Sequence, residues 1–213
     1  MKIYFDGCSW TKGAELENPE EERFSKLVCN ELGAEETNIA ISGGSNDRIV
    51  RNLLVDKNIE DYDLAVIQMT LPARTEYYNE GLSTTKRKSS SDQGWARVNP
   101  PHNFSKPFYQ RNLIIKWVDK QVKMQHSDFW KHWYMKITNV KYFITKEKID
   151  YHTIRNSRKI PLILLTINQW TKLPFDLQLE NGTRSMKHRY GHPNKEYHKL
   201  IANQILEFRE TLR

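Results

Sequence analysis

Three segments far apart in the sequence carry the side chains and flexible backbone that acyl transfer requires. Ser9 follows Gly7 just after a short apolar stretch, Gly43 belongs to a glycine pair, and His192 directly precedes Pro193. Ester hydrolysis by a serine needs a hydroxyl nucleophile, an imidazole that takes its proton, and N–H donors where the oxyanion forms. The sequence contains each kind of group.

The surrounding sequence alternates apolar strands with amphipathic helices. Residues 62–69 and 160–167 are almost continuously apolar, which is typical of strands buried on both faces of a parallel sheet. Further strands are expected at 2–5 and 37–41, and helices are expected at 19–32, around 49–54 and at 193–212. This order predicts an α/β fold in three α/β/α layers, with a mostly parallel, flavodoxin-like sheet of about five strands.

Such a sheet would bring the candidate groups together. Open α/β sheets bind ligands at the carboxyl ends of their strands. Ser9 and Gly43 each follow a predicted strand, and His192 lies just outside the start of the last predicted helix, where proline is favoured at the first position.

The chain of 213 residues has the length of one domain, so we expect a single domain over 1–213. Residues 76–159 form a predicted insertion between the third and fourth strands. Its first half, 83–107, resembles a long loop. Its second half has apolar residues at helical spacing: Trp130, Trp133, Ile137, Val140 and Ile144.

Charge is distributed unevenly along the chain, whose net charge is +7. Residues 1–85 are net acidic, whereas 86–159 are strongly basic and rich in aromatic residues. Such a segment can attract an anionic partner, or it can simply form a solvated face.

Two cysteines form no disulfide framework or paired zinc motif, so neither a metal nor another cofactor is expected. No signal peptide or membrane-length apolar run is readable, which predicts a cytoplasmic protein without membrane contact.

Three motifs resemble those of the SGNH (GDSL) hydrolases. The segment from Gly7 to Thr11, Gly-Cys-Ser-Trp-Thr, looks like the first block of the branch with a Gly-Cys-Ser-aromatic-Thr signature. Residues 38–46 are similar to the second block, and residues 191–194, Gly-His-Pro-Asn, to the last. The resemblance implies that Ser9 is the nucleophile and His192 the general base. It also implies that the N–H groups of Ser9 and Gly43 are oxyanion donors.

The third block departs from the family pattern. The family has Gly-x-Asn-Asp after the third strand and uses its asparagine as an oxyanion donor, whereas this chain reads Gln-Met-Thr-Leu-Pro-Ala-Arg over 68–74. Thr70 or Arg74 could substitute for that asparagine, or Asn46 could reach across from the second block. Taken one at a time, each of the three is better explained by a structural role than by a catalytic one.

The last block departs as well. The acid that the family places three residues before the base is replaced by Arg189. A backbone carbonyl or Asp176 could orient the imidazole instead. Arg74 and Arg189 are also candidates for substrate binding.

Together these features predict a serine esterase that acts on a small acyl ester, such as an acetyl group on a carbohydrate. The alternative is a catalytically impaired SGNH-like scaffold. Such a scaffold would serve as a binding or assembly module through its basic, aromatic-rich insertion, with an anionic glycan, a nucleic acid or another protein as its partner.

Overall fold

Five parallel strands form the central sheet, in the order β2-β1-β3-β6-β7. The structure is a computed structural model that describes residues 1–56, 58–78, 95–98, 133, 140–157, 160–167, 171–179 and 192–212. The strands are β1 (Lys2–Asp6), β2 (Glu35–Asn38), β3 (Leu64–Met69), β6 (Leu162–Thr166) and β7 (Leu177–Gln178). The flavodoxin-like order and the all-parallel pairing confirm the predicted fold class.

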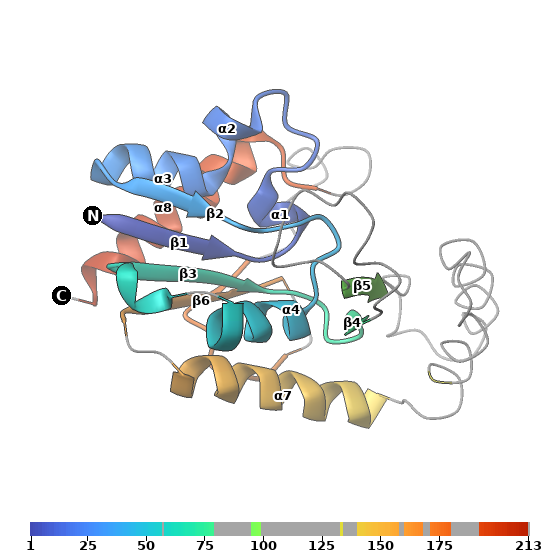
Figure 1. The fold of residues 1–213 in the computed structure, drawn as a ribbon. Helices are drawn as coiled ribbons and strands as arrows, with labels where there is room; N and C mark the ends of the chain where they lie inside the picture. The colour runs from blue at the N-terminus through green and yellow to red at the C-terminus, as the bar shows by residue number, and fades with distance from the viewer. Residues whose placement is uncertain are drawn as a thin grey trace.

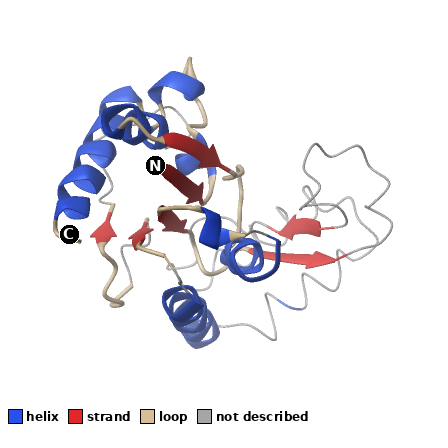
Figure 2. Ribbon diagram, turned by 60° about the vertical axis from the view of Figure 1, so that its left-hand side comes forward, coloured by secondary structure: helices blue, strands red, loops and turns tan. Residues whose placement is uncertain are grey.

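Helices cover both faces of this sheet (Figures 1 and 2). On one side lie α3 (Phe24–Leu32) and α8 (Lys195–Glu210), preceded in the chain by the short α1 (Ser9–Lys12) and α2 (Pro19–Glu22). On the other side lie α4 (Asn46–Arg51) and α7 (Val140–Ser157). The π-helix η1 (Asn52–Asp56) and the 3-10 helix η2 (Ile59–Asp61) follow α4. Among the described residues, no helix has the length and apolar character that crossing a membrane requires.

Alternate strand residues build two separate cores, because successive side chains of a strand point to opposite faces. Phe5 and Val66 pack with Ile201 of α8 on one face, whereas Tyr4 and Ile67 pack on the other. The second core also contains Ile49 of α4 and Tyr151 and Ile154 of α7. This two-sided burial explains why the central strands are continuously apolar in the sequence.

Two predicted elements differ from the structure. The helix expected at 19–32 is interrupted at Arg23, whose backbone is extended and whose guanidinium donates to both carboxylate oxygens of Glu36 at 2.9 Å. The second strand lies at 35–38 and not at 37–41. It ends where the Asn38 side chain accepts from the Ala40 N–H at 3.0 Å and donates to Ser25 Oγ at 2.8 Å. In both cases polar side chains redirect the backbone.

The interval 76–159 contains more regular structure than its composition predicts. Strand β4 (Thr75–Tyr78) pairs antiparallel with β5 (Trp95–Val98), which lies inside the predicted loop. Figure 1 shows this pair beyond the carboxyl ends of the sheet strands. The described helix α7 begins at Val140, so the predicted helical positions Trp130 and Ile137 lie outside the described residues. So does most of the basic segment.

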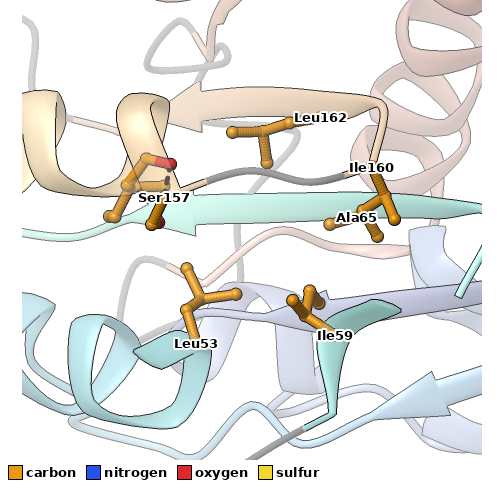
Figure 3. A pocket seen from close by; sticks show the side chains of 7 residues that line it. Leu53, Ile59, Ala65, Ser157, Ile160 and Leu162 are labelled. Atoms are coloured by element: carbon orange, nitrogen blue, oxygen red, sulfur yellow. Dashed lines mark hydrogen bonds between the residues drawn. The ribbon is translucent and has the colours of Figure 1, made fainter. Parts of the chain in front are cut away.

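A small apolar cavity lies between η1, β3, β6 and α7 (Figure 3). Leu53, Ile154 and Leu162 contribute to its lining, and the hydroxyl of Ser157 donates to the Ile154 carbonyl at 3.1 Å. Its space of about 10 Å³ is no more than one water molecule needs. The cavity is therefore a packing gap in the second core, near the amino ends of β3 and β6 and away from the carboxyl ends where the candidate residues lie.

A buried ion pair joins the end of β1 to α4. Arg48 Nη1 donates to Asp6 Oδ1 at 2.8 Å, and both side chains are almost completely buried. Asn52 donates to Asp6 Oδ2 at 2.8 Å, and Arg48 Nη2 donates to the Ile39 carbonyl at 3.0 Å. The Gly7 N–H also donates to Asp6 Oδ1 at 2.8 Å. These bonds hold together the first strand, the segment after the second strand and α4.

Replacing Arg48 with methionine is expected to lower the free energy of unfolding by about 3 to 5 kcal/mol, because Asp6 would remain buried without its cation. Urea unfolding followed by circular dichroism measures the change. Lys195→Met is the control, since Lys195 pairs with Glu22 at the surface, where solvent screens the charges, and its loss should leave stability almost unchanged. Equal losses in the two variants would contradict a stabilising role for the buried pair.

Candidate active site

Ser9 lies where the first strand passes into α1. The Cys8 backbone is extended, with φ −109° and ψ −154°, and Ser9 is the first residue of the helix. The serine is 5 % exposed, and its hydroxyl donates to Cys8 Sγ at 3.9 Å. This location at the carboxyl edge of a central strand is the one that the sequence predicts for the nucleophile.

Gln68 of β3 holds the turn that carries Ser9. Its Oε1 accepts from the Cys8 N–H at 3.3 Å, from the Cys8 thiol at 3.3 Å and from the Thr11 hydroxyl at 2.9 Å. A Cβ at Gly7 would collide with Thr11 Oγ1 and lie 3.0 Å from Gln68, so only glycine fits there. The role of Gln68 is not apparent from its position in the sequence, because it depends on contacts between two strands.

Gly43 and Gly44 form a turn against this segment. The Gly44 N–H donates to the Ile41 carbonyl at 2.9 Å, and Gly43 has φ +74° between them, a backbone conformation that favours glycine. A Cβ at Gly44 would lie 2.7 Å from the Gly7 carbonyl oxygen. Within the described residues, the N–H groups of Ser9 and Gly43 have no acceptor. Both predicted oxyanion donors are therefore unengaged.

His192 lies just before α8 and contacts a carboxylate that the sequence analysis did not single out. Its Nδ1 is 2.7 Å from Glu15 Oε2, and both side chains are about one-fifth to one-quarter exposed. A carboxylate only accepts hydrogen bonds, so this contact assigns the imidazole hydrogen to Nδ1 and leaves the lone pair on Nε2. That tautomer is the one in which Nε2 can act as a base.

Glu15 occupies an unusual backbone conformation. Its φ is +71°, the one positive φ at a non-glycine residue among the described residues. A glutamate in this left-handed region is sterically disfavoured by about 1 to 2 kcal/mol. Strain of this kind gathers at functional sites, where the surrounding structure imposes it. Neither the spacing to Ser9 nor any motif in the sequence indicates that Glu15 would meet His192.

Aromatic packing brings the start of α8 to α1. The rings of Trp10 and Tyr197 are 5.9 Å apart in an edge-to-face arrangement. Asn194 caps α8 by accepting from the Tyr197 N–H at 3.1 Å. His192 is thus positioned by the same helix start that contacts the neighbour of Ser9. Among the described residues, no direct hydrogen bond joins Ser9 Oγ to His192.

The candidate acid Asp176 is engaged elsewhere. Its Oδ2 accepts from the Leu164 N–H at 2.7 Å, and its Oδ1 lies 2.7 Å from Arg155 Nη2. These contacts join the segment before β7 to β6 and α7. The structure therefore gives Asp176 a structural position and brings Glu15 to the imidazole. Arg189 lies outside the described residues.

The three candidates for the third oxyanion donor lie together after β3. Asn46 donates to the Thr70 carbonyl at 3.2 Å and accepts from the Thr70 N–H at 2.8 Å. Arg74 Nη1 donates to Thr70 Oγ1 at 2.5 Å and to the Gly44 carbonyl at 3.5 Å. All three side chains are at least nine-tenths buried. In the described part of the chain, no three His, Cys, Asp or Glu side chains gather as metal ligands would.

Comparison with known proteins finds similar folds among solved structures. The chain is 15 % identical to the psychrotrophic esterase EstA from Pseudoalteromonas sp., with 99 % of this chain and 97 % of that one covered and a TM-score of 0.45. It is 14 % identical to LAE5, an alpha/beta hydrolase enzyme from the metagenome of Lake Arreo, with 100 % and 96 % covered and a TM-score of 0.49. No family model and no curated protein matches the sequence.

Gln68→Leu tests how the turn that carries Ser9 is held. The substitution would leave the Cys8 N–H and the Thr11 hydroxyl buried without an acceptor, so we expect a loss of about 2 to 4 kcal/mol in the free energy of unfolding. Gln204→Leu, on the partly exposed surface of α8, is the control and should change it by less than about 0.5 kcal/mol. Chemical denaturation measures both, and a Gln68→Leu variant as stable as the wild type would contradict this role.

Proposed function

We propose that this protein hydrolyses a small acyl ester, with Ser9 as nucleophile, His192 as general base and Glu15 as the acid that orients the base. The contact of 2.7 Å between Glu15 Oε2 and His192 Nδ1 carries this proposal. It supplies the carboxylate that the resemblance to SGNH hydrolases requires and that the last block lacks. The N–H groups of Ser9 and Gly43 complete the set as oxyanion donors.

The first half of the proposed reaction forms an acyl-enzyme. The Ser9 hydroxyl turns from Cys8 Sγ toward His192 Nε2 when the substrate binds, as catalytic hydrogen bonds often tighten only in the complex. Ser9 Oγ attacks the carbonyl carbon and its proton passes to Nε2. The carbonyl π electrons move to the oxygen, which accepts from the Ser9 and Gly43 N–H groups. Collapse of this intermediate breaks the ester C–O bond, and the alcohol leaves with the proton from Nε2.

The second half releases the acid. A water molecule gives a proton to Nε2 and attacks the acyl carbon, and the resulting tetrahedral intermediate expels Ser9 Oγ, which takes that proton back. Glu15 accepts from Nδ1 throughout and stabilises the imidazolium that forms twice in each cycle, as the aspartate of a serine triad does. The strained backbone of Glu15 keeps its carboxylate at Nδ1.

For the substrate, the proposal specifies a short acyl chain, and an acetyl group on a carbohydrate as the leading example. A small acyl group suits a nucleophile that is only 5 % exposed. The carbohydrate follows from the family resemblance alone. An anionic partner at the basic segment stays a prediction, because most of that segment lies outside the described residues.

Ser9→Ala provides the primary test of the proposal. Hydrolysis of p-nitrophenyl acetate by the wild type should fall to background in Ser9→Ala, because the nucleophilic oxygen is removed. Release of p-nitrophenol measures the rate. Thr211→Ala, which removes an exposed hydroxyl at the end of α8, should keep the wild-type rate. Background rates for both the wild type and Ser9→Ala would eliminate the esterase and favour the binding module.

Glu15→Gly separates the orienting role of Glu15 from a contribution to folding. Loss of the carboxylate should lower kcat by about 10² to 10⁴-fold, near the effect of removing the acid of a serine triad. The free energy of unfolding should stay unchanged or increase by up to about 1 kcal/mol, since glycine adopts φ +71° without steric cost.

Asp176→Asn is the matched comparison for Glu15→Gly. It removes the other candidate acid, and we expect it to leave kcat unchanged while lowering stability, because it weakens the ion pair with Arg155. The reverse pattern, with activity lost in Asp176→Asn and kept in Glu15→Gly, would assign the acid to Asp176.

A further inference from the structure

Arg74 is a buried cation without a carboxylate partner. It ends the turn after β3, where its N–H donates to the Leu71 carbonyl at 3.0 Å, and it is 6 % exposed. Its Nη1 donates to Thr70 Oγ1 at 2.5 Å and to the Gly44 carbonyl at 3.5 Å. Its Nε is buried and has no hydrogen-bond partner. Within the described ranges, no aspartate or glutamate forms an ion pair with it.

Other well-buried cations of this protein are neutralised. Arg48 pairs with Asp6 at 2.8 Å, Arg51 pairs with Glu76 at 2.9 Å, and Lys146 lies 2.7 Å from the carboxylates of both Asp47 and Asp150. An unpaired buried charge is costly, because it loses its hydration without a compensating partner. Arg74 therefore differs from these structural cations, because within the described residues no carboxylate pairs with its charge and its buried Nε has no hydrogen-bond partner.

The charge of Arg74 acts on the turn that carries the nucleophile. Burial opposes ionisation of the Cys8 thiol, but the Arg74 guanidinium and the Trp10 N–H outweigh it and hold the pKa of Cys8 below its usual range. Ser9 Oγ lies 3.9 Å from Cys8 Sγ. On its other side, Arg74 contacts Gly44, the residue after the candidate donor Gly43. The guanidinium is thus next to both elements that supply the oxyanion N–H groups.

The neighbouring candidates for a third donor are already engaged. The side-chain amide of Asn46 is already engaged, since its nitrogen donates to the Thr70 carbonyl and to the Asp150 carboxylate and its oxygen accepts from the Thr70 N–H. The Thr70 hydroxyl oxygen accepts from Arg74 and fixes the guanidinium, and of these two groups only the guanidinium is positively charged. We propose that Arg74 is the third oxyanion donor, in place of the asparagine expected after the third strand. This inference rests on the proposed function.

A guanidinium at this position would act mainly on the transition state. The ester carbonyl is neutral when the substrate binds, and its oxygen becomes negative only when Ser9 Oγ attacks. Arg74 would gain its missing counter-charge at that moment, so its interaction is stronger in the transition state than in the ground state. Such differential stabilisation raises kcat and leaves KM almost unchanged.

Arg74→Met and Arg74→Lys, assayed with p-nitrophenyl acetate beside the wild type and Ser9→Ala, test the inference. Methionine keeps an unbranched apolar side chain and removes an unpaired buried charge, so the fold should survive, which the Tm checks. We expect kcat to fall about 10² to 10³-fold in Arg74→Met with KM within about twofold. Arg74→Lys should recover part of kcat, because lysine restores the positive charge. In a separate rescue experiment, guanidinium ion added at millimolar concentration should raise kcat in Arg74→Met but not in Arg51→Met.

Two outcomes would overturn the inference and leave the esterase intact. One is Ser9-dependent hydrolysis with a kcat in Arg74→Met within about threefold of the wild type. The other concerns an ester with a carboxylate on its acyl chain, such as p-nitrophenyl hydrogen succinate. For this ester the KM of Arg74→Met would be raised with kcat unchanged, whereas its KM for the acetate would not be raised. That result would make Arg74 a binding group for a substrate anion. Absence of Ser9-dependent hydrolysis in the wild type would instead overturn the proposed function.

Discussion

The buried ion pair between Asp6 and Arg48 is the interaction on which the candidate site depends. Burial raises the pKa of Asp6, and the Arg48 guanidinium with the Asn52 amide and the Gly7 N–H acts in the opposite direction and stabilises the carboxylate. Because Asp6 ends the first strand, the same bonds set the direction in which the chain leaves the sheet. Ser9 follows three residues later. A polar network inside the fold thereby positions a polar site at its edge.

Around this network, the candidate site combines ordinary positions for the proposed nucleophile and base with unusual supporting groups. Ser9 follows the first strand and His192 precedes the last helix, as in the family that the motifs resemble. The proposed acid, however, is Glu15 in the loop after α1, and the position after β3 carries a cation, Arg74, where that family has a neutral amide. A site that loses two supporting groups and gains two others nearby is consistent with retained chemistry.

Much of this arrangement was predictable from local patterns. Continuous apolar strands alternating with helices specify a parallel sheet, because only strands covered on both faces are apolar throughout. The proximity of Ser9 and Gly43 follows from the rule that the carboxyl ends of parallel strands lie at the same edge of a sheet. The break at Arg23 was not predictable, since it depends on Glu36 in a neighbouring strand. Strand β5 was missed for a similar reason, because its composition resembles that of a loop and its partner is β4.

By itself, the sequence determined the fold class, the order of the main strands and helices, and the places of Ser9, Gly43 and His192 at the ends of those elements, because periodicity and glycine placement are local properties of the chain. Only the tertiary structure decided which groups support them. Glu15 meets His192 across 177 residues of sequence, and it does so from a left-handed backbone conformation that its residue type does not favour. Arg74 stands out only because no aspartate or glutamate of the described residues pairs with it. Contacts between residues so far apart in the sequence depend on how helices and loops pack against the sheet. No local sequence pattern specifies that packing.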